Sequence, residues 1–274
     1  MRSASRSAAN ARRWVPSPLL TASGALHAGA LMAALVRPRI WPWSLAAVAL
    51  NQALLTAAGL WPKSRVLGPN WTHLPPANAA RGEVAITIDD GPDPHVTPQV
   101  LSQLAAHGAH ASFFCVGERV ERYPDLAREI VRGGHAIENH SQRHRHLFSL
   151  LGPGAMEREI ARAQDSIVRA TGGVPSFFRA PAGLRNPFLE PILCRLELRL
   201  ASWTHRGFDT VVGDANSVYR RLTHAVRGGD ILLLHDGNAA SGRGGTPVIL
   251  EVLPRLLDAL AALRLRPITL RAAL

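Results

Sequence analysis

The sequence predicts an α/β protein: an incomplete (β/α) barrel of about seven strands, preceded by an N-terminal membrane helical hairpin. Two observations carry this prediction. Between residues 82 and 271, apolar runs of strand length alternate with helix-like segments, a pattern typical of parallel strands with helices outside the sheet. Before residue 62 lie two apolar stretches of membrane-spanning length. A chain of 274 residues accommodates one domain of about 200 residues plus such an appendage.

The predicted hairpin consists of residues 18–36 and 41–61, separated by the basic sequence "RPR" at 37–39. Both stretches are rich in alanine, and His27, Asn51 and Gln52 interrupt them. They are therefore marginal spans by composition. The alternative is a cleaved signal peptide followed by a buried helix. We favour a two-helix hairpin that makes the protein integral to the inner (cytoplasmic) membrane.

Basic residues around the two stretches predict the orientation of the hairpin. Four arginines precede the first stretch: Arg2, Arg6, Arg12 and Arg13. Two more lie between the stretches, and Lys63 and Arg65 follow the second. The positive-inside rule then leaves both ends of the hairpin, and the rest of the chain, in the cytoplasm. This expectation reverses if only one stretch spans the membrane.

The sequence pattern changes at "LPPAN", residues 74–78, and this change divides the chain into residues 1–75 and a globular domain over residues 76–274. The formal net charge is +11, but the arginines are scattered and do not alternate with aromatic residues. We therefore expect no nucleic-acid partner. The two cysteines form neither a disulfide framework nor a paired-cysteine zinc motif.

Seven apolar runs are the expected strands of the globular domain. They are residues 84–89, 111–116, 135–139, 176–179, 198–203, 231–235 and 267–270. The expected helices between them are residues 97–108, 124–132, 154–170, 187–197, 216–227 and 247–264. In the first helix, Thr97 is the expected N-cap, Pro98 the first helical residue and Gly108 the terminator.

Six side chains of catalytic type lie at or just beyond the C-terminal ends of expected strands: Asp89, Asp90, His140, Arg179, Asp209 and His235. In (β/α) barrels the chemistry gathers at the C-terminal ends of the strands. We therefore expect these six side chains to share one rim of the barrel.

The sequence "HSQRH" places His140 and His144 four residues apart, so that on a helical turn both rings face the same side and can hold one ion. The alternative is a solvated polar face, because His135 and His146 lie nearby. Asp90 is the carboxylate that completes the set. Two histidines and one carboxylate suit zinc, and also other divalent metals, including non-haem iron.

Asp89 and Asp90, the two adjacent carboxylates in "VAITIDDGPDP", residues 84–94, either begin a tight turn or take part in catalysis. If Asp90 is a ligand, Asp89 is left as a neighbouring general base. A metal lowers the pKa of its water from about 16 toward about 7, so a carboxylate suffices as base near neutral pH.

Two further side chains have both a structural and a chemical interpretation. Arg179 is either a surface loop residue or the partner that keeps Asp89 ionised. His235 ends an apolar run, so it is either a core histidine or a general acid beside an apolar pocket. Asp209 is placed to orient the His235 ring and raise its pKa. We interpret Asp236, which precedes a glycine, as part of a turn.

Four segments, taken in their order, resemble the motifs of the polysaccharide deacetylase (NodB-homology) family of carbohydrate esterases. They are "TIDDGPDPHVTPQVL", "HSQRH", "RAPAG" and "LLLH". The resemblance covers about residues 82–271. It implies a distorted, incomplete (β/α) barrel that removes an N-acyl group, usually acetyl, from an amino sugar with the help of a divalent metal, most simply Zn²⁺. The substrate is then a glycan or a lipid-linked saccharide.

Carried over residue by residue, the resemblance makes Asp89 the catalytic base, Arg179 the residue that positions it and His235 the general acid. It gives the metal ligands as Asp90, His140 and His144. The backbone N–H of Ala182 matches the donor that helps to stabilise the oxyanion, and Leu233 lines the pocket for the acyl methyl group.

The chain departs from the family pattern at several positions. Ile88 and Ala182 stand where the family usually has aromatic residues. In "RGFDT", Arg206 and Thr210 replace an aspartate and a tryptophan, while Asp209 remains to orient His235. The open alternatives are a deformylase acting on a lipid-linked amino sugar, a non-catalytic glycan-binding relative and a membrane-bound oxygenase.

Overall fold

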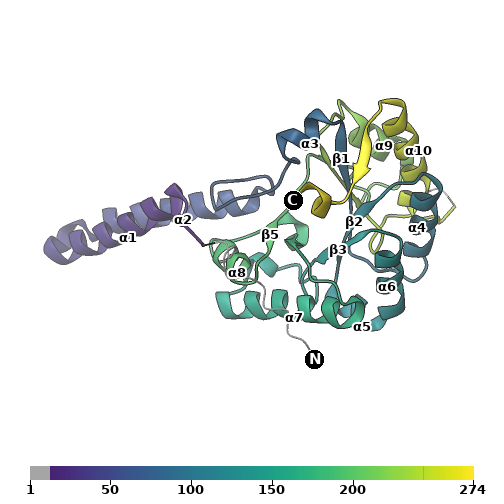
Figure 1. The fold of residues 1–274 in the computed structure, drawn as a ribbon. Helices are drawn as coiled ribbons and strands as arrows, with labels where there is room; N and C mark the ends of the chain where they lie inside the picture. Colours follow the sequence, from purple (N-terminus) through teal and green to yellow (C-terminus); the bar gives the residue numbers. More distant parts are fainter. Residues whose placement is uncertain (1–12, 243) are drawn as a thin grey trace.

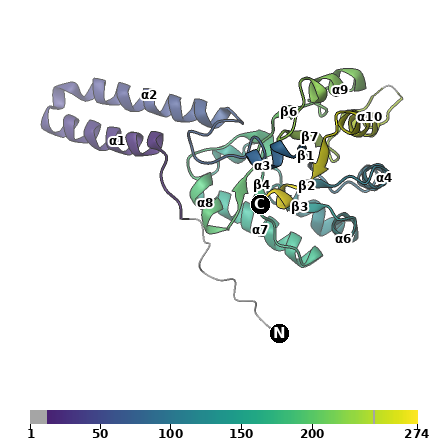
Figure 2. The ribbon, with the colours of Figure 1, turned by 45° about the horizontal axis from the view of Figure 1, so that its top comes forward.

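The computed structural model describes residues 13–242 and 244–274. A curled, entirely parallel sheet with strand order β5-β4-β3-β2-β1-β7-β6 forms the centre, and β8 pairs with the start of β1 (Figures 1 and 2). The strands are β1 (Glu83–Asp89), β2 (Ala111–Cys115), β3 (Ala136–Asn139), β4 (Phe177–Phe178), β5 (Arg199–Leu200), β6 (His205–Arg206), β7 (Ile231–His235) and β8 (Arg266–Ile268). The prediction of an incomplete (β/α) barrel is confirmed.

The only strand in the described part of the chain that the sequence did not predict is β6. It has two residues, pairs with the middle of β7 and contains no apolar run. Pairing with a long neighbour, rather than its own pattern, therefore makes this segment a strand.

Helices cover the outer face of the sheet (Figure 2). They are α4 (Thr97–Ala106), α5 (Gly117–Arg122), α6 (Pro124–Arg132), α7 (Pro153–Thr171), α8 (Leu189–Arg195), α9 (Ala215–Thr223) and α10 (Val248–Ala262), while the short α3 (Pro76–Ala80) precedes β1. The sequence did not predict α3 or α5. The helix expected over 216–227 ends at Thr223, and residue Ala225 has a positive φ of 54°, which a helix cannot continue through.

Strand β1 has one apolar face and one face that carries a functional side chain. Val84, Ile86 and Ile88 lie in the cluster that packs against the outer helices. Because side chains alternate along a strand, Ala85, Thr87 and Asp89 face the other side. The last of these three is therefore directed into the barrel, where the register aligns it with His235 of β7.

The beginning of α4 differs by one residue from the prediction, because Val96 rather than Thr97 is the N-cap. The Asp93 carboxylate accepts hydrogen bonds from the backbone N–H groups of His95 and Val96, at 2.9 and 3.0 Å, and thereby starts the turn. The Thr97 hydroxyl instead donates to Asp236, 2.5 Å away.

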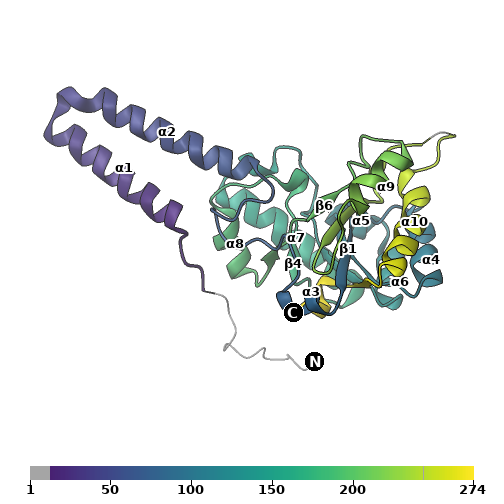
Figure 3. The same cartoon turned by 90° about the horizontal axis from the view of Figure 1, so that it is seen from above.

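The N-terminal hairpin projects from the sheet and its helices (Figure 3). It consists of α1 (Pro18–Val36) and α2 (Trp41–Leu60), joined by a turn of 3₁₀ helix, and both helices are long and apolar enough to cross a membrane. The polar residues that interrupt the apolar stretches bond to each other across the hairpin: Asn51 donates to the Ser23 hydroxyl over 2.8 Å, and Gln52 and His27 lie 3.1 Å apart. Such bonds hold helices together in lipid. Arg2, Arg6 and Arg12, which the charge argument uses, lie outside the described residues.

The end of α2 is bonded to the loops at the mouth of the barrel. The Arg185 N–H donates to the Gly59 carbonyl at 3.1 Å, and a Cβ at Gly59 would lie 2.1 Å from the Arg185 carbonyl oxygen, so only glycine fits there. The Lys63 ammonium donates to the Thr204 carbonyl at 2.6 Å, and the Ser202 hydroxyl donates to the Pro62 carbonyl at 2.7 Å. The end of the hairpin is thus bonded to the chain segments that contain Gly183 and Trp203, two residues that line the site described next.

Candidate active site

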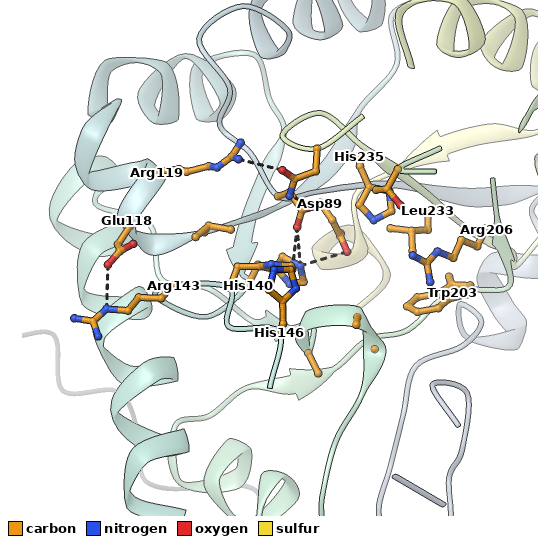
Figure 4. A pocket seen from close by; sticks show the side chains of 18 of the residues that line it. Asp89, Glu118, Arg119, His140, Arg143, His146, Trp203, Arg206, Leu233 and His235 are labelled. Atoms are coloured by element: carbon orange, nitrogen blue, oxygen red, sulfur yellow. Dashed lines mark hydrogen bonds and ion pairs between the residues drawn. The ribbon is translucent and has the colours of Figure 1, made fainter. Parts of the chain in front are cut away.

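A cavity of about 550 Å³ opens at the C-terminal ends of the strands. All the sequence-predicted site residues except Arg179 and Asp209 line it, and those two contact lining residues from behind. Figure 4 shows Asp89 and His140 in the middle, Glu118, Arg119 and Arg143 on one side, and Trp203, Arg206, Leu233 and His235 on the other.

Asp90, His140 and His144 form a cluster suited to a divalent cation. Their ligand atoms all lie within 4.8 Å of one another, and Asp90 Oδ1 lies 3.2 Å from His140 Nε2 and 3.1 Å from His144 Nε2. This carboxylate oxygen is buried and accepts no hydrogen bond in the described structure. A buried, unsatisfied anionic oxygen facing two imidazole nitrogens fits a metal with two histidine ligands and one carboxylate ligand.

The two histidines meet on a loop, and the prediction that they share a helical turn is wrong. Ser141 and His144 have positive φ values of 64° and 47°, which no helix contains. The loop is held by the Asn139 side chain, which accepts from the Ser141 N–H at 2.9 Å, and by the Ser141 hydroxyl, which accepts from the His144 N–H at 3.1 Å. These bonds bring the ring centres of His140 and His144 to 4.8 Å.

Residues after β7 fix Asp90 in place, and the sequence analysis missed them. The Asn238 amide donates to Asp90 Oδ2 at 2.8 Å. A Cβ at Gly237 would lie 2.4 Å from the Asp90 carbonyl oxygen, so this position requires glycine. Asp90 itself has a φ of 76°. The turn after β7 therefore orients the carboxylate of the candidate cation cluster.

The pKa values distinguish the groups of this cluster. Burial alone would raise the pKa of Asp90, but its contact with His140 and the charges of His140, His144 and His235 lower it well below the ordinary range. Burial, reinforced by the His140 charge, lowers the pKa of His144 to about 4. Near neutral pH, Asp90 is thus ionised and His144 is neutral, which are the forms that bind metals.

Arg179 is fully enclosed and holds Asp89. Its Nη1 donates to Asp89 Oδ1 at 2.6 Å and to the Thr87 hydroxyl at 2.9 Å, while Nη2 and Nε donate to the carbonyls of Ser202 and Ala201 at 2.7 and 3.1 Å. Burial lowers the pKa of the guanidinium, and the Asp89 charge opposes this shift. Asp89 Oδ2 remains directed toward the cluster, 3.8 Å from His140 Nε2.

We expect Arg179→Met to lower the free energy of unfolding by about 3–5 kcal/mol, because removing one member of a buried ion pair leaves the other buried and unpaired. Thermal or denaturant unfolding of the full chain measures this loss. The control is Arg195→Met, which removes an exposed partner of Glu157 and should change stability little. Equal losses in the two variants would contradict the role of the buried pair.

His235 and Asp209 form a second buried pair. His235 Nδ1 lies 2.9 Å from Asp209 Oδ1, and the His235 backbone N–H donates to Asp209 Oδ2 at 2.7 Å. Burial alone would lower the pKa of His235, but the hydrogen bond to Asp209 and the negative charges of Asp209, Asp89 and Asp90 raise it. The imidazole of His235 therefore retains a proton to higher pH than an ordinary histidine, with Nε2 left for the cavity.

Ala182 and Leu233 line the cavity between these pairs. Ala182 lies in the short segment Pro181–Gly183 with a φ of 56°, a conformation that costs energy for a residue with a Cβ and that is frequent at functional sites. Leu233 is buried on β7, two residues before His235. Together with Trp203 it provides an apolar wall.

The interpretation of Asp236 as ordinary turn material is incomplete. The backbone does bend at Asp236, but the Asp236 carboxyl group is buried, and burial raises its pKa to about 7. The Asp236 carboxylate accepts a hydrogen bond from the Thr97 hydroxyl, and a Cβ at Gly91 would lie 2.5 Å from the Asp236 oxygens. Asp236 therefore packs behind the loop that carries Asp90. An Asp-Gly pair gives no sign of such burial in the sequence.

The curled parallel sheet and the carboxylate–histidine cluster at its C-terminal edge define a (β/α)-barrel hydrolase. Residues 77–201 match the family model described as polysaccharide deacetylase. The chain is 34% identical over 189 residues to the chitooligosaccharide deacetylase of Azorhizobium caulinodans, covering 66% of this chain and 90% of that protein. The chain belongs to the polysaccharide deacetylase family.

Two other relatives agree with this assignment. The chain is 34% identical over 176 residues to a peptidoglycan-N-acetylglucosamine deacetylase of Bacillus cereus, covering 63% of this chain and 81% of that protein. Among solved structures, a peptidoglycan N-acetylglucosamine deacetylase bound to an N-oxidanyl-benzamide superposes with a TM-score of 0.66 at 25% identity, covering 74% of this chain and 92% of the other. The predicted family resemblance is confirmed.

Proposed function

We propose that the protein is a metal-dependent N-deacetylase that removes an acetyl group from an amino sugar in a glycan or a lipid-linked saccharide. One observation carries the proposal. The Asp90–His140–His144 cluster lies in one cavity between two buried pairs of complementary chemistry, Asp89 with Arg179 and His235 with Asp209. An acid and a base on either side of a cation site are what amide hydrolysis needs.

Asp90, His140 and His144 would hold the metal, and Zn²⁺ suits this set of ligands. When bound, such an ion supplies Lewis-acid chemistry: it polarises a carbonyl oxygen and lowers the pKa of water toward about 7. The chain's own contribution is to keep one carboxylate oxygen and two imidazole nitrogens directed at one point. The buried position of Asp90 Oδ1 supports this assignment.

Asp89 acts as the general base. Arg179 holds one of its oxygens, so the carboxylate keeps a fixed direction, and its other oxygen takes the proton of the attacking water. His235 acts as the general acid and gives its proton to the departing amine. The Ala182 N–H donates to the developing oxyanion, and Leu233 contacts the methyl of the acetyl group.

Asp209→Asn should move the descending limb of the pH profile to lower pH. His235 is active in its protonated form, which exists below its pKa and is lost as the pH rises through that value. Asp209 raises this pKa, so removing the carboxylate charge lowers it. The measurement is kcat/KM for amine release against pH. A descending limb that stays in place would show that another group provides the proton.

We further propose that α1 and α2 anchor the protein in the cytoplasmic membrane. Large apolar side chains on the hairpin, including Leu31, Leu35, Leu45, Leu50 and Leu54, are more than half exposed. This exposure disfavours the alternative in which α2 is a buried helix, because water would contact its apolar surface. Reporter fusions at the C-terminus test the side, for which the charge rule favours the cytoplasm.

The activity is tested by assaying free amine from a panel of N-acylated amino sugars, in glycan and lipid-linked form, with the enzyme before and after chelation. Release that stops on chelation and returns with Zn²⁺ supports the proposal. Absence of release from every member of the panel by the metal-loaded enzyme would refute it. Formylated members of the panel separate a deformylase from a deacetylase.

A further inference from the structure

A second cavity, of about 600 Å³, lies beside the active-site cavity and shares Arg206 with it. We call it the basic pocket. Its other lining residues are Thr204, His205, Phe208, Ser217, Arg220, Arg221 and His224. None of these is a carboxylate. The basic pocket therefore adds a concentrated positive charge to one side of the site where the amide is hydrolysed.

Arg206 and Arg221 lie against the same aromatic ring. Their guanidinium carbons are 4.9 and 5.3 Å from the centre of the Phe208 ring, which is 46% exposed and has a φ of 60°. The conformation of Phe208 is unfavourable for a non-glycine residue, so the surrounding fold imposes it. Phe208 thus provides an aromatic surface beside both cations.

Neither Arg206 nor Arg221 forms an ion pair with a carboxylate in residues 13–242 or 244–274. Arg206 Nε is also buried without a hydrogen-bond acceptor among these residues. Two arginines on the opposite wall differ in this respect, because Arg143 pairs with Glu118 at 3.0 Å and Arg119 donates to the Gly237 carbonyl at 3.0 Å. The Nε donor of Arg206 is therefore left without an acceptor in the described part of the chain.

The basic pocket also adjoins the root of the hairpin. Lys63, three residues after the end of α2, donates to the carbonyl of Thr204, which lines the pocket. If the hairpin lies in a membrane, the pocket is held close to the lipid surface. A sugar joined to a lipid through a phosphate would then present its amide to the active-site cavity and its phosphate to the basic pocket.

We propose that the basic pocket binds a phosphate group of the substrate through Arg206 and Arg221, so that the enzyme acts on a phosphate-bearing N-acetyl amino sugar. This proposal rests on the proposed deacetylase function and names its substrate class. Guanidinium groups suit phosphate because their paired N–H donors match two of its oxygens. Arg206, which lines both cavities, is the residue that sets the preference for a phosphate-bearing substrate.

The test compares kcat/KM for amine release from N-acetylglucosamine, N-acetylglucosamine 1-phosphate and a short-chain lipid ester of that phosphate. The wild type should prefer the phosphorylated substrates by about 10- to 100-fold. Arg206→Gln should remove most of this preference and Arg221→Gln part of it. Arg227→Gln, which removes an exposed charge outside both cavities, should retain it. If the wild type prefers only the lipid ester, the bound phosphate belongs to a lipid headgroup. If it prefers the lipid ester and N-acetylglucosamine 1-phosphate equally, the bound phosphate is that of the sugar phosphate.

A phosphate preference that Arg206→Gln leaves intact, or no preference in the wild type, would overturn the inference while leaving the deacetylase function standing. Absence of amine from all substrates would instead refute the proposed function. Binding then tests the basic pocket independently: calorimetric titration with inorganic pyrophosphate should show at least about tenfold weaker binding to Arg206→Gln than to the wild type or Arg227→Gln. Equal binding by all three proteins would overturn the inference.

Discussion

Asp89→Asn is expected to reduce amine release by about 10²- to 10⁴-fold, the usual contribution of a general base. The amide is the same size as the carboxylate and can still contact Arg179, so the fold is retained, but it cannot accept the proton of water near neutral pH. Because Asp89 is not among the three cluster residues, the variant should still bind one metal ion per chain.

The neighbouring substitution Asp90→Asn is the matched control for this experiment. It also removes one carboxylate charge, from the next residue along the chain, but it weakens the metal site itself. Metal content and amine release should fall together in Asp90→Asn, whereas in Asp89→Asn only amine release should fall. Normal release by Asp89→Asn, or loss of its metal, would exclude the proposed division of labour between the two carboxylates.

His235→Ala should reduce amine release by a similar factor, about 10²- to 10⁴-fold, because the departing amine then has no positioned proton donor. The metal should remain bound. The control is His107→Ala, which removes an imidazole 3.4 Å from the Asp258 carboxylate on the outer helices, away from the cavity. Retention of full activity by His235→Ala, with a pH profile like that of the wild type, would assign the acid to another group.

Much of the fold could be predicted because its determinants are local. The apolar runs that alternate with helical segments predicted every strand except β6, and the bounds of α1 match the prediction at both ends. The convergence of six side chains at one rim also followed from sequence, since parallel strands place their C-terminal ends together. The register of β1 with β7, which aligns Asp89 with His235, required the structure.

What the sequence could not predict depends on loop conformation and on burial. The positive φ values of Ser141 and His144 bring the two histidines together on a loop, although their spacing is equally typical of a helix. Asn238 and Asp236 contribute from the turn after β7, where an Asp-Gly pair has the appearance of ordinary turn material. Their importance arises from contacts with residues 148 and 139 positions earlier in the chain, which no local pattern encodes.

The proposed mechanism requires one divalent cation at the mouth of the barrel, with Asp90 as its carboxylate ligand and Asp89 free beside it. Anomalous scattering at the zinc edge from crystals of the metal-loaded full chain tests it most directly. We expect one peak per chain, about 2.0–2.2 Å from an Asp90 oxygen and from His140 Nε2 and His144 Nε2, with no Asp89 oxygen at that distance. A peak bound through Asp89, or none between the two histidines, would contradict it.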